Sequence, residues 1–218
     1  MKNKLSKYRH VWILSYAFIY LPWFFYLEKT VTSNYHIMYV AIDDLIPFNE
    51  YFIIPYLLWF VYVAGAVGYF FFTDVKSYYR LCTMLFTGMT ISLMICTVFP
   101  NGTDFRPVID PSKNIFTKIV SILYSADTCT NVFPSIHVYN SICVHFAILK
   151  SERLKRHHLI KAASFLLMVS ICLATVFLKQ HSAFDGLGAI VMAYIMYQFV
   201  YAGSYEPKRN KVTEKAIS

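Results

Sequence analysis

Apolar residues along this chain come in six long runs, separated by shorter segments that carry most of the charge. Most of the runs are close to the roughly 20 residues that an α-helix needs to cross a bilayer. The pattern therefore predicts an all-α protein, a polytopic bundle of six transmembrane helices. The runs are Val11–Tyr26, Phe52–Phe72, Leu81–Phe99, Val132–Leu149, Leu159–Leu178 and Phe184–Tyr201. The first run is bulky and aromatic and no small-residue cleavage site follows it, so we expect a span rather than a secretory signal.

Two longer segments between the runs are expected at one membrane surface. Residues 28–50 mix apolar and acidic positions and should lie over that surface. Residues 100–131 contain apolar positions at helical spacing, which predicts a short amphipathic interfacial helix in this outer loop. These positions are Ile115, Phe116, Ile119, Val120, Ile122 and Leu123. We expect residues 1–204 to form one membrane domain and the polar residues 205–218 to form a cytoplasmic tail.

Composition supports membrane residence. Hydrophobic residues make up 57% of the chain and charged residues 15%, against about 25% charged in typical soluble domains. The net charge of +8 does not indicate nucleic-acid binding, because with six spans fifteen of the twenty lysines and arginines fall on one side. This positive-inside asymmetry predicts that both termini are cytoplasmic. We expect an integral protein of the plasma membrane with its site on the outer face.

Cysteines and a possible glycosylation site leave two questions open. The five cysteines show no C-x-x-C spacing, so we expect neither a metal nor a cofactor. Cys96 and Cys129 fall near the same face, where a disulfide or two free thiols would be compatible with the sequence. The sequence Asn101-Gly102-Thr103 fits a glycosylation acceptor, although Asn-Gly is also typical of a tight turn.

Ionisable residues gather in three stretches near the ends of the spans, "FPNGTDFRP", "FPSIH" and "FLKQHSAFDG". A charge at the centre of a membrane helix costs about 2.5–3.5 kcal/mol on insertion scales, so such residues usually have a function. The expected topology puts all three stretches at the same membrane face. Their coincidence is the main reason to expect a functional site there.

The stretch "FLKQHSAFDG" predicts a nucleophile or base, and the stretch "FPSIH" predicts an anion-binding helix start. His181 and Asp185 are four residues apart, so on a helix the carboxylate can accept a hydrogen bond from the imidazole. That bond fixes the tautomer and leaves the other ring nitrogen as a nucleophile or base. Pro134 is expected as the first helical residue, leaving the N–H groups of Ser135 and Ile136 to face an anion.

The remaining polar residues complete a phosphate site. The Ser135 hydroxyl can donate a hydrogen bond, and His137 can supply a proton. Arg106 offers a planar fork that suits phosphate oxygens, and Lys179 adds a second positive charge. Any one of these could instead be structural, since single histidines near helix ends usually are and Lys179 could snorkel to the interface. Their combination, in order and on one face, favours the site.

These motifs resemble the type 2 phosphatidic acid phosphatase and vanadium haloperoxidase superfamily, over about residues 99–190. The family pattern is a lysine, six residues and Arg-Pro; then Pro-Ser-Gly-His; then Ser-Arg, five residues, His, three residues and Asp. Here "FRP" matches the end of the first part, "PSIH" matches the second part and "HSAFD" matches the end of the third part. The resemblance implies that His181 attacks phosphorus, Asp185 orients it and His137 protonates the leaving group.

The chain also departs from that pattern. The first-motif lysine would fall at Phe99, the Ser-Arg pair at Ala174 and Thr175, and the second-motif glycine at Ile136. Two phosphate-binding cations of the family are therefore missing, and Lys179 could replace one of them. Such variants look like the subgroup of inositol phosphorylceramide and sphingomyelin synthases, which pass the phospho-head group to another lipid's hydroxyl.

Three functions follow as hypotheses. The first is an integral membrane hydrolase that removes phosphate from a phosphomonoester or diphosphate lipid through a phosphohistidine. The second is a lipid phospho-head-group transferase on the same scaffold. The third is a non-catalytic membrane protein that has kept the fold. The expected partners are a lipid phosphate and the bilayer, without nucleic acid. The sequence leaves the particular lipid, the acceptor and the oligomeric state open.

Overall fold

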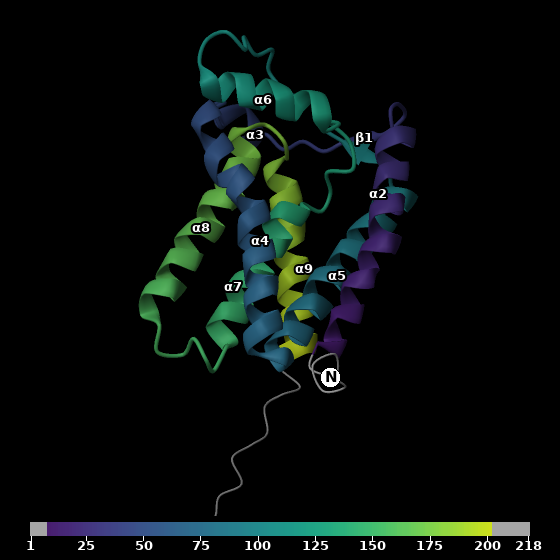
Figure 1. The fold of residues 1–218 in the computed structure, drawn as a ribbon. Coiled ribbons are helices and arrows are strands. Elements are labelled where there is room, and N and C mark those ends of the chain that lie inside the picture. The colour runs from purple at the N-terminus through teal and green to yellow at the C-terminus, as the bar shows by residue number, and fades with distance from the viewer. Residues whose placement is uncertain (1–7, 202–218) are drawn as a thin grey trace, which may run out of the picture.

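The computed structural model describes residues 8–201, and most of them are helical. The long helices run side by side as a bundle (Figure 1). In chain order they are the 3₁₀ helix η1 (Arg9–Tyr16) continuing into α2 (Ala17–Thr30), then α4 (Ile53–Thr73), α5 (Val75–Val98), α7 (Ile136–Lys150), α8 (His158–Phe177) and α9 (Ala183–Tyr201). The prediction of a helical membrane protein is therefore confirmed in its coarse form.

Within residues 8–201, five helices are long and apolar enough to cross a membrane, so the predicted count of six is not confirmed. The exception is α7, whose 15 residues span about 22 Å, less than the roughly 30 Å hydrocarbon core. It begins at Ile136 rather than at Val132 because the preceding residues bind a loop instead. The N–H groups of Val132 and Phe133 both donate to the Asn101 side-chain oxygen, at 2.9 and 2.8 Å.

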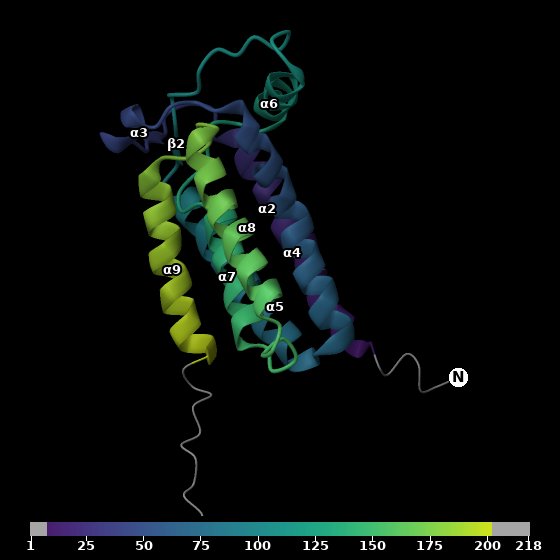
Figure 2. The same ribbon diagram turned by 90° about the vertical axis from the view of Figure 1, so that its left-hand side faces the viewer.

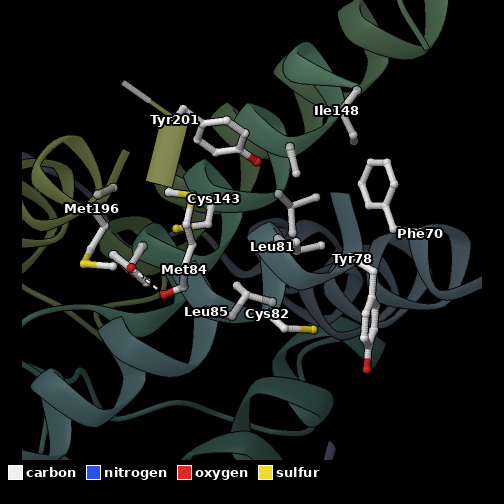
Figure 3. Close-up of a cluster of buried hydrophobic side chains, with 14 of the residues drawn as sticks. Phe70, Tyr78, Leu81, Cys82, Met84, Leu85, Cys143, Ile148, Met196 and Tyr201 are labelled. Atoms are coloured by element: carbon white, nitrogen blue, oxygen red, sulfur yellow. Dashed lines mark hydrogen bonds between the residues drawn. The ribbon is translucent and has the colours of Figure 1, made fainter. Parts of the chain in front are cut away.

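Helix α7 nevertheless lies in the centre of the bundle, in contact with α4, α5, α8 and α9. Its residues Tyr139 and Cys143 are fully buried. Gly88 of α5 lets α7 approach closely, because a Cβ built there would lie 2.1 Å from the Tyr139 ring. The Tyr139 hydroxyl donates to the main-chain oxygen of Met84 at 2.6 Å. Figure 3 shows Cys143 beside side chains of α5 and α9 in this core.

The smaller elements gather at one end of the bundle. Helix α6 (Ile115–Ala126) lies across that end, and Figure 2 shows it nearly end-on. The short helix α3 (Ile42–Leu45), the 3₁₀ helix η2 (Glu50–Phe52) and the parallel strands β1 (His36–Ile37) and β2 (Asn101–Gly102) belong to the same end. The short helix predicted in the second outer segment is therefore present. The α4–α5 and α7–α8 connections lie at the opposite end (Figure 1).

Asn101 and the two cysteines have structural roles at this end. The Asn101 side chain is fully buried, and its amide nitrogen donates to the Phe99 main-chain oxygen at 2.8 Å. Asn101 therefore connects the segment after α5 to the segment before α7 by hydrogen bonds. Its side chain is not exposed for glycosylation in the folded protein. Cys96 and Cys129 are free thiols, so the disulfide left open by the sequence is absent.

Candidate functional site

The predicted contact between His181 and Asp185 is present. Nδ1 of His181 lies 3.3 Å from Oδ2 of Asp185, which also accepts the Ser182 N–H at 3.0 Å. His181 lies just before α9, and Asp185 occupies the first turn of that helix. Because an ionised carboxylate only accepts hydrogen bonds, the contact assigns the proton of His181 to Nδ1 and leaves Nε2 free.

Asp43 holds the start of α9 from a distant part of the chain. Its carboxylate accepts hydrogen bonds from the Ser182 hydroxyl at 2.5 Å and the Ala183 N–H at 2.8 Å. An acid is favourable there because the first N–H groups of a helix lack partners within it. This role of Asp43 was not predicted, although the pair of acids inside the apolar stretch "AIDDLI" was a signal for it.

Lys179 is engaged by the same loop. Its ammonium donates to the main-chain oxygen of Asp43 at 2.6 Å and lies 5.7 Å from the centroid of the Phe105 ring. The structure therefore places this charge against the loop beside α9. It does not bring Lys179 together with the two histidines as the phosphate-site prediction required.

His137 is held between aromatic rings of α4. Its ring centroid lies 4.6 Å from that of Tyr56 and 4.4 Å from that of Trp59. The His181 ring meets it edge-on, with centroids 5.8 Å apart. Nδ1 of His137 is buried without a hydrogen-bond partner. The two histidines that the sequence predicted as a pair are therefore neighbours.

Arg106 joins the loop after α6 to the residue before His181. Its two terminal nitrogens donate to the main-chain oxygens of Asp127 and Thr128, both at 2.8 Å. One of them also bonds the side-chain oxygen of Gln180, and the guanidinium lies over the Tyr124 ring at 4.7 Å. The Arg106 guanidinium, which was expected to bind phosphate, thus binds oxygens of the protein. Arg106 therefore holds the loop after α6 and the Gln180 side chain in position.

The start of α7 differs from the prediction. Ser135, rather than Pro134, flanks the helix as its N-cap, because its hydroxyl accepts the Val138 N–H at 3.5 Å. The Ser135 N–H donates to the main-chain oxygen of Asp185 at 3.2 Å, so it links α7 to α9 and is not free for an anion. The Ser135 side chain is fully buried. Ile136 is among the residues that line the cavity described next.

A small polar cavity of about 60 Å³ lies where these segments meet. The two histidines form part of its wall, together with Gln180, which is 1% exposed. The volume has room for a group of a few heavy atoms. The lining residues are Phe24, Glu28, Asp127, Thr128, Thr130, Asn131, Val132, Ile136, His137, Gln180 and His181.

Two carboxylates also line this cavity, and neither was predicted as a site residue. Glu28, at the end of α2, accepts hydrogen bonds from the Thr128 hydroxyl at 2.7 Å and the Asn131 amide at 2.9 Å. Burial raises the pKa of Asp127, while the nearby Arg106 guanidinium acts to lower it. Glu28 borders the first apolar run, so its position was visible in the sequence but its partners were not.

Unpartnered buried polar atoms cluster around the cavity. Three belong to residues that line it, Asn131 (Oδ1), His137 (Nδ1) and Gln180 (Nε2), and two belong to residues that bond its wall, Arg106 (Nε) and Asp185 (Oδ1). Buried polar atoms in folded proteins are nearly always hydrogen-bonded, and each unpaired group costs about 1–3 kcal/mol. A ligand with several hydrogen-bonding atoms would satisfy such a set, so the cluster identifies the cavity as the candidate site.

A large apolar groove adjoins the cavity. Its volume of about 630 Å³ is within the usual range of ligand pockets, about 300–1,000 Å³. Residues of α2, α4, α5 and α7 form its walls, and Phe24, Asp127, Ile136 and His137 line both spaces. A polar hollow that continues into an apolar groove has the shape required by an amphiphile.

Among residues 8–201, no group of three or more histidine, cysteine or acidic side chains is arranged to hold a metal ion. Comparisons with known protein families, curated proteins and solved structures found no match for this chain.

Proposed function

We propose that this chain is an integral membrane enzyme that hydrolyses a lipid phosphate through a phosphohistidine on His181. One observation carries the proposal: His181, backed by Asp185, and His137 share the wall of a small polar cavity that adjoins a large apolar groove. The cavity would hold the phosphoryl group and the groove would hold the lipid chain. The resemblance of the three sequence motifs to lipid phosphatases supports the same assignment.

In the first half-reaction, the free Nε2 of His181 attacks phosphorus. The new nitrogen–phosphorus bond forms as the bond from phosphorus to the lipid oxygen breaks. Asp185 holds the ring in the required tautomer and stabilises the positive charge that develops on it. His137 donates a proton to the departing oxygen, so the lipid leaves as a neutral alcohol.

In the second half-reaction, water attacks the phosphohistidine. His137, now without its proton, accepts one from this water as the nitrogen–phosphorus bond breaks. Inorganic phosphate leaves and His181 is restored. The unpartnered amide nitrogen of Gln180 would donate a hydrogen bond to a phosphoryl oxygen, and Arg106 would act through it by holding the Gln180 side chain in place. A neutral donor would then stand where the family has a cation.

The two acids of the cavity favour a second candidate, transfer of a phospho-head group to a lipid hydroxyl. Glu28 and Asp127 line the cavity, and both repel a bound anion. A phosphomonoester carries about −1.5 to −2 charges near pH 7, whereas a phosphodiester carries one, so repulsion penalises the monoester more. Hydrolysis remains the leading proposal because it requires no second lipid beside the groove.

The test uses the purified full-length protein in lipid–detergent micelles. Phosphatidic acid, phosphatidylglycerol phosphate, a prenyl diphosphate and a sphingoid phosphate are supplied separately, and release of inorganic phosphate is measured. The same assays are repeated with radiolabelled phospholipid and either diacylglycerol or ceramide, to detect head-group transfer. Acid-labile phosphate on the protein is measured during turnover.

We expect phosphate release by the native protein and none by His181→Ala, which should also lack the acid-labile phosphate. His137→Ala should retain a trace of activity, reduced about 10²–10⁴-fold by loss of a general acid. The control is His36→Ala, at the same end of the bundle but outside the cavity. Label moving to the acceptor lipid would support transfer. A fully active His181→Ala protein would overturn both reactions.

A further inference from the structure

Two residues that line the apolar groove carry buried polar atoms that the proposed reaction does not use. Nε1 of Trp59 and Oδ1 of Asn140 are buried without hydrogen-bond partners, and both residues line the groove. Their neighbours there are almost entirely apolar, including Phe60, Val63 and Leu85. Two unsatisfied groups in one hydrophobic groove carry a cost that a bound ligand could remove.

Both residues are placed next to His137. Asn140 lies three residues after His137 on α7, so the two side chains occupy the same helix face. The Trp59 ring packs on His137 from α4, with centroids 4.4 Å apart. Asn140 is 1% exposed, which fixes its amide within the groove wall. Both residues therefore lie beside His137, which lines the groove and the polar cavity.

We propose that Trp59 and Asn140 form a hydrogen-bonding subsite for the linkage region of an amphiphile, and that this linkage carries both a donor and an acceptor, as an amide or a hydroxyl does. The inference rests on the proposed function in taking a membrane amphiphile as the occupant of the groove. It adds that the groove recognises the polar linkage of the amphiphile as well as holding its apolar chain.

The atoms decide which linkages fit. The indole N–H can only donate a hydrogen bond, and the carboxamide oxygen can only accept one. An ester offers acceptors alone, so it would satisfy Trp59 and leave Asn140 unpaired. A plain hydrocarbon would satisfy neither. An amide satisfies both at once, through its carbonyl and its N–H.

A matched pair of probes tests this directly. N-ethyl dodecanamide and ethyl dodecanoate carry no hydroxyl and differ in one position, where N–H replaces oxygen. Equilibrium binding of each radiolabelled probe is measured on the full-length protein in nanodiscs. The native protein should bind the amide about 3- to 10-fold more tightly, the effect of one net hydrogen bond.

Two variants assign the effect to the subsite. Asn140→Leu should remove the preference for the amide, because the N–H then loses its acceptor. Trp59→Phe should weaken both probes by a similar factor, because both carry the carbonyl. Trp23→Phe is the control, since the Trp23 N–H already donates to Thr97 at 3.0 Å and the residue does not line the groove.

Equal binding of the two probes by the native protein would overturn the subsite, and this comparison needs no variant. An unchanged amide preference in Asn140→Leu would overturn it as well. Because the readout is binding, the test is independent of turnover. A protein without phosphatase activity that prefers the amide would retain the subsite and lose the proposed reaction, whereas an active enzyme without that preference would do the reverse.

Discussion

The carboxylate of Asp43 accepts a hydrogen bond of 2.5 Å from the hydroxyl of Ser182, a residue 139 positions further along the chain. Ser182 directly follows His181, and its own N–H donates to Asp185. The loop that contains α3 is thereby tied to the residue between the proposed nucleophile and its orienting acid. Asp43 is buried, so this tie is protected from water.

Replacing Asp43 should lower turnover. Without the carboxylate, the Ser182 hydroxyl and the Ala183 N–H lose their acceptor and His181 loses its fixed position. A shift of about 1 Å in such a group can cost about 10²-fold in rate. We expect Asp43→Ala to reduce kcat more than it changes KM, and Asp43→Asn to recover part of the loss by keeping one acceptor.

The adjacent acid provides the control for that experiment. Asp44 carries the same charge but accepts its hydrogen bond from Tyr39, outside the site. Asp44→Ala should therefore leave kcat unchanged. If Asp43→Ala and Asp44→Ala behave alike, the contact with Ser182 has no part in positioning His181.

Arg106 should not tolerate replacement by lysine. A guanidinium reaches two main-chain oxygens and the Gln180 side chain together, whereas one ammonium lacks this planar geometry. Arg106→Lys should lower kcat by about 10-fold or more and alter the rate's pH profile, because the positive charge is no longer held in a fixed position beside Asp127. Lys179→Ala is the comparison, and we expect a smaller effect since its ammonium bonds Asp43 away from the cavity. A kcat loss in Lys179→Ala equal to that in Arg106→Lys would contradict this ranking.

Contacts between residues close together in the sequence could be predicted for this site, whereas contacts between residues far apart could not. His181 and Asp185 are four residues apart, so helical geometry alone indicated their contact. Glu28 and Thr128 are 100 positions apart, and local patterns contain no information about such pairs. The roles of Arg106 and Ser135 were misjudged for the same reason, because their partners lie on segments whose arrangement only tertiary packing determines.

The fold was easier to predict than the site, because the length of a hydrophobic run is a local property of the sequence. The boundaries of the five long apolar helices lie close to the predicted runs, except that α5 begins at Val75 rather than at the predicted Leu81. The run from Val132 was misjudged because apolar residues also line a loop there. The buried Asn101 side chain holds that loop in place, and hydropathy cannot distinguish this use from the start of a helix.

Gly88 should be required for the packing of α5 on α7. Substitution by alanine adds a Cβ 2.1 Å from the Tyr139 ring, and overpacking of this kind costs about 1–3 kcal/mol. This outweighs the roughly 1 kcal/mol that alanine gains over glycine in a helix. The midpoint of thermal unfolding should fall in Gly88→Ala. It should not fall in Gly68→Ala, where a Cβ meets nothing within 4 Å.

Stability should depend on pH through Asp127. Its raised pKa means that the folded protein holds this proton more tightly than the unfolded chain does. Ionisation of Asp127 therefore destabilises the fold; the penalty is absent below the unfolded pKa of about 3.9 and complete above the folded pKa. Asp127→Asn should raise the unfolding midpoint at pH 7, and the gain should vanish towards pH 4. A gain that persists at low pH, or one matched by the exposed Asp104→Asn, would exclude this cause.

The membrane orientation predicted from the basic residues can be tested at the two ends of the bundle. Val108 is fully exposed beside α6, and Lys155 is exposed in the α7–α8 connection at the other end. In a background where the five native cysteines are replaced, a membrane-impermeant thiol reagent applied to intact cells should label Val108→Cys and spare Lys155→Cys. Permeabilised cells should show labelling of both, which controls for reactivity. The reverse pattern would move the cavity to the cytoplasmic face, because Arg106, His137 and His181 all lie at the α6 end and would change sides together.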